Sequence, residues 1–291
     1  MGLYELFIQP FAEFGFMRRA LVACVALALG SAPMGTLLVL RRMSLMGDTM
    51  AHAVLPGAAI GFALAGFSLP AMGAGGLAAA LLAALLAGWV AQVTTQREDA
   101  SFAAFYLIAL DAGVLIVSLH GTPVDLMHVL FGSILAVDDS ALIGVAAVAS
   151  LTLLAVAALY RPLLVASVDP GFLRSVGGAE RTLHFVFLGL VVLNLVAGFQ
   201  ALGTLMAVGL MMLPATAARF WAHEVWSLAG VATLIALASA AGGLLLSYHL
   251  QLPSGPAIVL LAGAAYIVSF LAGRHDSLLA RRLALHAHRV A

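Results

Sequence analysis

Residues 141–160 read ALIGVAAVASLTLLAVAALY, a run of twenty residues without a charged side chain. A helix of this length spans about 30 Å, which matches the hydrocarbon core of a bilayer. Similar apolar stretches lie on both sides of it, at 20–40, 51–67, 71–93, 102–119, 183–199, 201–218, 226–248 and 256–273. The sequence therefore predicts an all-α integral membrane protein, a polytopic bundle of nine transmembrane helices, with eight as the alternative count.

The composition indicates that lipid surrounds most of this chain. Hydrophobic residues make up 64% of the sequence, charged residues only 9%, and the mean hydropathy is +1.12. Soluble domains carry about 25% charged residues, so the excess apolar surface requires a membrane. We expect residues 1–291 to form a single transmembrane domain. The net charge of zero gives no indication of nucleic-acid binding, and the single cysteine, Cys24, excludes an internal disulfide.

The basic residues are all arginine, 13 in number, and there is no lysine. A Walker A loop needs a lysine to reach the nucleotide phosphates, so the chain is not a conventional P-loop ATPase. Arginine also predicts orientation, because cytoplasmic loops carry most basic residues. Eleven of the 13 share one side if the following segments are cytoplasmic: 41–50, 94–101, 161–182, 219–225 and the tail 274–291. The other two, Arg18 and Arg19, then lie outside, in an N-terminal segment (9–19) expected at the membrane interface.

Small residues predict where helices approach each other closely. Helices in lipid associate through tight packing, which glycine and alanine permit. The runs GAGG (73–76) and AAGG (240–243) are therefore expected at helix–helix contacts. Almost no linker separates the spans 183–199 and 201–218, so a tight turn is expected near Gly198 to Gly203.

One pair of ionisable residues near the start of the second span is a candidate metal site. Asp48 and His52 are four residues apart, so on a helix they lie on one face. A carboxylate oxygen and an imidazole nitrogen together suit zinc, manganese or iron. The alternative is structural: Asp48 caps the start of a helix, and a neighbour satisfies His52.

Other acidic residues and a histidine raise similar alternatives. Asp125 and His128 lie three apart in the outward connection 120–139; they either receive a cation at the mouth of a pathway or are a loop aspartate and an interfacial histidine. Asp111 interrupts the span 102–119, where it either lines the pathway or is neutral and hydrogen-bonded between helices. The adjacent pair 138–139 either attracts cations or caps the next helix.

The sequence contains no recognisable catalytic motif, which favours a transporter or channel over an enzyme. There is no G-x-S-x-G elbow, no H-E-x-x-H and no Rossmann glycine pattern. Several other motifs follow one another in a specific order: RRMSLMGD (41–48), HAVLPG (52–57), RED (97–99), YRPL (160–163), DP (169–170), QALGTL (200–205), MLPATAAR (212–219), SYH (247–249) and LPSGP (252–256). In this order, over residues 10–273, they resemble the membrane permease subunits of bacterial ABC importers for zinc, manganese and chelated iron.

The resemblance implies an assembly and roles for several residues. It implies a two-fold dimer with the translocation path at the subunit interface. Two ATP-binding subunits would dock beneath this dimer, and an extracytoplasmic binding protein would deliver the metal. It implies that Asp48 and His52 belong to the metal pathway. It also implies that segment 161–182 contacts the ATPase, through Asp169, Pro170, Phe172 and Gly177. Neither Asp111 nor the pair at 125 and 128 belongs to the general pattern.

The resulting hypothesis is a permease subunit in the bacterial cytoplasmic membrane that imports a divalent transition metal. The resemblance implies a homodimer, and no permanently bound cofactor is expected. Histidine with carboxylate favours zinc, with manganese or iron next. One alternative is an ion-coupled secondary metal transporter, which needs no ATPase and would use Asp111 as a proton relay. An intramembrane metalloprotease lacks its motif, and a membrane scaffold would not transport.

Overall fold

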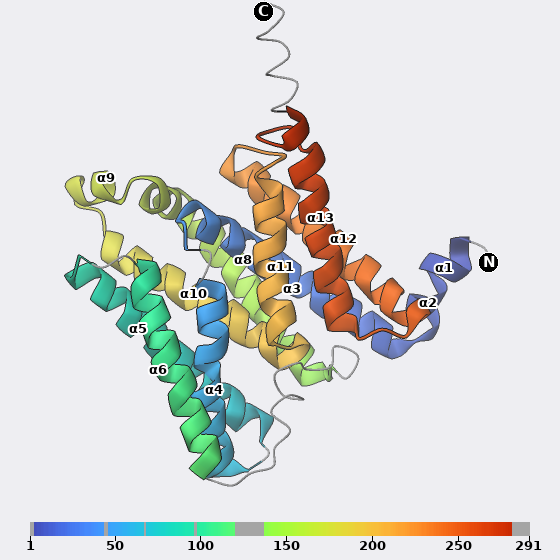
Figure 1. Ribbon diagram of the computed structural model, residues 1–291, viewed down its shortest axis with the longest axis horizontal. Coiled ribbons are helices and arrows are strands. Elements are labelled where there is room, and N and C mark those ends of the chain that lie inside the picture. The colour runs from blue at the N-terminus through green and yellow to red at the C-terminus, as the bar shows by residue number, and fades with distance from the viewer. Residues whose placement is uncertain (1–2, 44–45, 67, 96–97, 120–136, 281–291) are drawn as a thin grey trace, which may run out of the picture.

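The computed structural model describes residues 3–43, 46–66, 68–95, 98–119 and 137–280 (Figure 1). These residues are almost entirely helical, and no strand occurs among them. Two short helices, α1 (Leu3–Phe7) and α2 (Gln9–Glu13), come first. The further helices are α3 (Gly15–Leu40), α4 (Met46–Ala65), α5 (Leu69–Val93), α6 (Glu98–Leu119), α8 (Asp139–Val168), α9 (Pro170–Ser175), α10 (Glu180–Leu202), α11 (Thr204–Ala218), α12 (Val225–Leu250) and α13 (Ser254–Ala272).

In the described part of the chain, eight helices are long and apolar enough to cross a membrane, which confirms the predicted fold class. They are α3, α4, α5, α6, α8, α10, α12 and α13. The ninth candidate span, 201–218, corresponds to α11, which has only 15 residues. A helix of that length reaches about 22 Å, short of the ~30 Å hydrocarbon core. The alternative count of eight therefore matches the number of full-length helices.

The long helices form two groups joined by a central layer (Figure 1). Helices α4, α5 and α6 pack on one another on one side, and α11, α12 and α13 do so on the other. Between them lie α3, α8 and α10, of which α3 and α10 are the most deeply buried of the candidate spans. A buried hydrogen bond from Asn194 Nδ2 to Thr152 Oγ1 (2.7 Å) joins α10 to α8 within this layer.

Polar contacts show which connections share an end of the bundle. At one end, the Arg41 side chain contacts Ser167 and His184, and the His275 backbone N–H donates to the Phe220 carbonyl (2.9 Å). At the other end, Arg19 forms an ion pair with Asp139 (3.4 Å). We call the first the Arg41 end; segments near 41, 161–182, 219–225 and 274–280 gather there, as arginine placement predicts.

Glycine permits the tight crossing of α4 and α5. A Cβ atom at Gly57 would meet the Gly75 carbonyl oxygen, and one at Gly61 would lie 2.5 Å from the Ala71 carbonyl oxygen. A Cβ at Gly76 would approach Val54, and in α12 a Cβ at Gly243 would clash with Ile258 of α13. Both small-residue runs singled out in the sequence thus lie at helix–helix contacts.

Replacing Gly57 with alanine should destabilise the protein by about 1–2 kcal/mol, because the new methyl group meets backbone atoms that cannot move aside cheaply. The matched control is Gly189→Ala on α10, where an added Cβ has no neighbour within 4 Å. That change should be neutral or slightly stabilising, since alanine is the better helix former. Thermal unfolding of the purified proteins measures both; equal melting temperatures for the two variants would refute the proposed crossing.

Candidate functional site

Asp48 and His52 lie on one face of α4, as their spacing predicts. Asp48 is in the first turn of the helix, and its Oδ1 atom is 3.8 Å from Nε2 of His52. The Asp48 side chain is 68% exposed and that of His52 is 40% exposed, whereas Thr49, Met50 and Ala51 between them are buried. The pair therefore sits on the outer surface of a single chain, with its polar atoms accessible to a ligand or to another chain.

Neighbouring helices fix the position of this pair. The His52 ring lies against the Tyr106 ring of α6, with 5.1 Å between the ring centroids. Gly47, next to Asp48, faces Val208 and Met212 of α11, which a Cβ would meet at 3.5–3.6 Å. Asp48 is the third residue of α4, so it does not precede the helix as a capping residue would. The capping alternative thus gains no support from the geometry.

The pair supplies two ligand groups, one oxygen and one nitrogen. Among the residues that the structure describes, no group of three or more histidine, cysteine, aspartate or glutamate side chains could hold a metal ion. The described part of one chain thus offers an incomplete coordination shell, because transition-metal sites in proteins use four to six donors. Further donors, such as water or a second chain that covers this surface, would complete it.

Asp111, another predicted metal ligand, does not join the pair. Asp111 lies on α6 with an exposed side chain and forms no cluster with Asp48 and His52. Asp125 and His128 lie outside the described residues. Their assignment stays a prediction.

The adjacent aspartates at the start of α8 have structural partners. Asp138 caps the helix: its Oδ1 accepts from the Ala141 N–H (2.9 Å) and its Oδ2 from the Ser140 hydroxyl (2.7 Å). These hydrogen bonds, first that from Ala141, lower the pKa of the Asp138 carboxyl. Asp139 pairs with Arg19. Of the two alternatives for this dipeptide, helix capping accounts for Asp138 directly.

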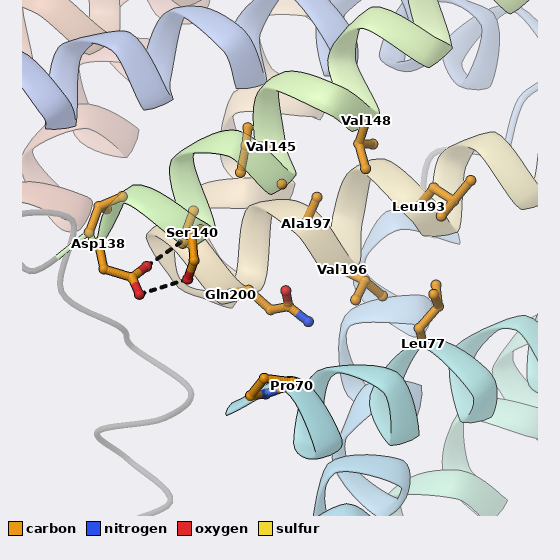
Figure 2. Close-up of a pocket in the computed structure, with 14 residues that line it drawn as sticks. Pro70, Leu77, Asp138, Ser140, Val145, Val148, Leu193, Val196, Ala197 and Gln200 are labelled. Atoms are coloured by element: carbon orange, nitrogen blue, oxygen red, sulfur yellow. Dashed lines mark hydrogen bonds between the residues drawn. The ribbon is translucent and has the colours of Figure 1, made fainter. Parts of the chain in front are cut away.

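A cavity of about 740 Å³ lies beside Asp138, between α5, α8 and α10 (Figure 2). Its walls are mainly apolar, with Val145 and Val148 from α8 and Leu193 from α10. Gln200, near the end of α10, projects into the space facing Pro70. Composition and spacing did not reveal this cavity, because its walls come from helices far apart in the sequence.

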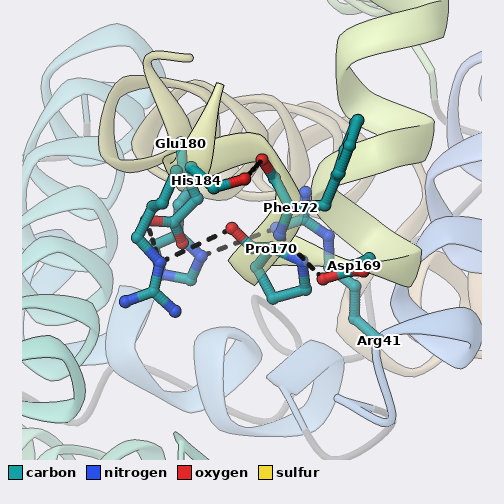
Figure 3. A network of polar contacts seen from close by, with 8 residues as sticks. Arg41, Asp169, Pro170, Phe172, Glu180 and His184 are labelled. Atoms are coloured by element: carbon teal, nitrogen blue, oxygen red, sulfur yellow. Dashed lines mark hydrogen bonds and ion pairs between the residues drawn. The ribbon is translucent and has the colours of Figure 1, made fainter. Parts of the chain in front are cut away.

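At the Arg41 end, a short polar segment carries a well-defined helix. Asp169 caps α9 by accepting the Phe172 N–H at Oδ1 (2.9 Å), and Pro170 occupies the first turn, where its missing N–H costs nothing. Gly177 ends the helix with φ +74°, a left-handed conformation that glycine adopts without strain. Asp169, Pro170 and Phe172 therefore lie together at the start of α9 (Figure 3), and Gly177 follows its end.

Large apolar side chains on and around α9 are exposed. Phe172 is 56% exposed, Val168 at the end of α8 is 71% exposed and Val176 after α9 is 67% exposed. An ion pair between Arg174 Nε and Glu180 Oε2 (3.9 Å) ties the turn to the start of α10. Clustered apolar side chains with polar neighbours at the end of a helical bundle are typical of a protein–protein contact.

Arg41 joins this turn to the end of α3 through contacts that sequence reasoning missed. Its Nε donates to Ser167 Oγ (2.9 Å), and its guanidinium lies 4.1 Å from the Phe187 ring centroid. Its Nη1 is 3.5 Å from His184 Nδ1 (Figure 3). His184 is only 5% exposed. Residues 41 and 184 are too far apart in the sequence for a spacing pattern to predict their contact.

Some side-chain nitrogen atoms of Arg41 and its neighbour His184 lack hydrogen-bond partners among the described residues. Burial lowers the pKa of Arg41 to about 10, and the carboxylates of Glu98 and Glu180 oppose that shift. Within the described residues, Arg41 Nη2 and His184 Nε2 are buried without a hydrogen-bond partner. Each such atom costs about 1–3 kcal/mol relative to a hydrogen-bonded one.

Comparison with known proteins identifies the family of this chain. The model of the ABC 3 transport family matches residues 13–273. Over 265 residues, the chain is 31% identical to the manganese import system permease protein ScaB of Streptococcus parasanguinis, covering 91% of this chain and 93% of that protein. Over 269 residues, it is 29% identical to the chelated iron transport system membrane protein YfeD of Yersinia pestis, covering 92% and 89%.

The fold agrees with a solved structure. The structure of PsaBC from Streptococcus pneumoniae in complex with Fab matches with a TM-score of 0.82 at 27% sequence identity, covering 96% of this chain and 100% of that chain. The family match covers most of the sequence, and the eight long apolar helices fit a multi-pass protein of the bacterial cytoplasmic membrane. The chain therefore belongs to the ABC 3 transport family, as a membrane permease subunit with a transport role and not an enzymatic one.

Proposed function

We propose that this chain forms half of a permease dimer that imports a divalent metal ion, with Mn²⁺ as the preferred substrate. The observation that carries the proposal is the Asp48–His52 pair, two metal-ligating groups 3.8 Å apart on an exposed face of α4. An ABC permease subunit works with separate ATPase subunits, and this chain has no lysine for a Walker A loop of its own. Family membership thus favours ATP-driven transport over the ion-coupled alternative.

The choice of manganese rests on the relatives. ScaB is named for manganese import and YfeD for chelated iron, so the zinc preference expected from the ligand types gains no support. A carboxylate and an imidazole suit manganese and iron as well as zinc, and affinity order alone does not select among them. Manganese is therefore the first substrate to test, followed by iron and then zinc.

The proposed dimer consists of two copies of this chain related by a two-fold axis. Because Asp48 and His52 are exposed on a single chain, an interface over this face of α4 would bring two carboxylates and two imidazoles together. Four protein ligands would replace part of the hydration shell of the ion. The match to PsaBC supports a paired arrangement of permeases.

The proposed transport cycle uses the two ends of the bundle. An extracytoplasmic binding protein delivers the metal at the end opposite Arg41, and two ATP-binding subunits dock at the Arg41 end, on the coupling segment (residues 161–182). ATP binding moves the coupling segments, and the metal site then changes access from outside to inside. The exposed side chains of Val168, Phe172 and Val176 are the apolar surface that this contact would cover.

The test is metal uptake by proteoliposomes that hold this chain, its ATPase and its binding protein. We expect ATP-dependent Mn²⁺ uptake that unlabelled Mn²⁺ suppresses more strongly than Fe²⁺ or Zn²⁺ does. Stronger suppression by Zn²⁺ than by Mn²⁺ would indicate that zinc, and not manganese, is the preferred substrate. Uptake that needs no ATP and stops when a protonophore is added would support the ion-coupled alternative instead.

Phe172→Ala should weaken ATPase binding about thirtyfold, because burying an aromatic side chain at an interface contributes about 2 kcal/mol or more and each 1.4 kcal/mol is a factor of ten. The expected result is less ATPase retained when the tagged permease is purified, with Mn²⁺ uptake reduced in proportion. Leu154→Ala is the matched control, since Leu154 is similarly exposed (70%) but lies within the span of α8. Equal ATPase retention by wild type and Phe172→Ala would remove Phe172 from the contact.

A further inference from the structure

We propose that Arg41 is a positioning residue that transmits movement of the coupling segment to the Asp48–His52 pair. This inference rests on the proposed function, in which the coupling segment meets the ATPase and the pair binds the metal. Arg41 does not touch either partner in that scheme. It would act through the helices that it connects.

The guanidinium of Arg41 holds both flanks of the coupling turn. Its Nε bonds to Ser167 near the end of α8, two residues before the cap of α9. Its Nη1 contacts His184 in the first turns of α10, and its plane lies over Phe187 one turn further on. A displacement of α9 that carries the end of α8 or the start of α10 with it would therefore stretch or shift the Arg41 contacts.

A short connection leads from Arg41 to the metal pair. Arg41 directly follows α3, and Asp48 is only seven residues further along the chain. The Met43 N–H donates to the Leu38 carbonyl (2.9 Å), the Met46 N–H donates to the Met43 carbonyl (3.1 Å), and both methionine side chains are buried. The described residues on both sides of 44–45 are thus held in place, so we expect a shift of Arg41 to be passed to the first turn of α4.

The polar groups of Arg41 and its neighbours can also form a second set of hydrogen bonds. Arg41 Nη2 and His184 Nε2 are buried without a partner in the described residues. Burial lowers the pKa of Arg41, and the carboxylates of Glu98 on α6 and Glu180 on α10 oppose that shift, so both act on its charge. A guanidinium with a spare donor and two carboxylates nearby can exchange hydrogen bonds when the helices move. Such discrete exchange is how packed elements switch between two states.

The inference predicts that Arg41→Met uncouples ATP hydrolysis from transport. In proteoliposomes with the full complex, we expect hydrolysis within about twofold of wild type, while Mn²⁺ uptake per ATP falls about tenfold, within the usual range of coupling between sites. Arg41→Lys keeps the charge but loses the forked guanidinium that reaches Ser167 and His184 together. Its Mn²⁺ uptake per ATP should therefore lie between that of wild type and that of Arg41→Met. A purely structural role would lower hydrolysis and uptake in parallel.

Two further variants keep the test decisive if Arg41→Met assembles poorly. Ser167→Ala removes one acceptor and should lower uptake per ATP about two- to threefold, and adding it to Arg41→Lys should cost less than the product of the single effects. Arg19→Met, at the opposite end of the bundle, should leave the ratio unchanged. A wild-type ratio in both Arg41 variants would overturn this inference alone, whereas absence of ATP-dependent uptake by the wild-type complex would overturn the proposed function and this inference with it.

Discussion

Asp48→Asn and His52→Ala are each expected to reduce ATP-driven Mn²⁺ uptake at least tenfold, and about a hundredfold or more when combined. Removing even an outer partner of a metal ligand costs about 10–100-fold, so loss of a direct ligand should cost no less. In a dimer of identical chains each substitution removes two ligands at once. Asparagine keeps the size of Asp48 but removes the charge that compensates the cation. The measurement is the initial rate of uptake at several Mn²⁺ concentrations.

Asp139→Asn is the matched control for this prediction. Asp139 is exposed like Asp48, and its ion pair with Arg19 is of the surface kind that contributes little to stability. Its uptake should equal that of wild type. If Asp48→Asn and His52→Ala also transport normally in an intact complex, the pair is not the metal site, although the chain remains an ABC permease.

Replacing Gly203 with asparagine should destabilise the protein by about 3 kcal/mol, the upper end of the cost of a strained backbone. Gly203 separates α10 from α11 and has φ +90° and ψ +158°, a region essentially confined to glycine. Asparagine could relieve the strain only by changing the direction in which α11 leaves the turn. The expected readout is a clearly lower melting temperature and a lower yield of monodisperse protein.

The same substitution at Gly66 provides the comparison. Gly66 has φ +63°, close to the left-handed helical region that asparagine tolerates, and an added Cβ would meet nothing within 4 Å. Gly66→Asn should therefore leave the melting temperature nearly unchanged. Similar stabilities for the two variants would mean that the reversal at Gly203 does not require glycine.

Apolar length and small-residue runs were sufficient to predict the helices and several of their contacts. The turn expected near Gly198 to Gly203 is centred on Gly203, and GAGG at 73–76 does face α4. Boundaries were less well predicted. The apolar run ends at residue 160, yet α8 continues through Pro162 to Val168, because the loss of hydropathy marks an environment and not the end of a helix.

The residues of the proposed site divide in the same way. That Asp48 and His52 share one helix face was predictable, because they are four residues apart. The contacts of Arg41 with Ser167 and His184 were not, since they link residues 126 and 143 positions apart. Sequence periodicity carries no information on which distant helices meet. Motif order supported the importance of residues 41–48 without indicating what Arg41 touches.

The placement of Asp48 in the first turn of α4 has a consequence for how long an ion would stay bound. The aligned peptide dipoles of a helix leave the equivalent of about half a positive charge at its N-terminus. That partial charge repels a cation near Asp48. If Asp48 ligates the metal as proposed, the ion would therefore be held weakly. A short residence time is what a carrier needs, whereas a storage site would place its carboxylate away from a helix start.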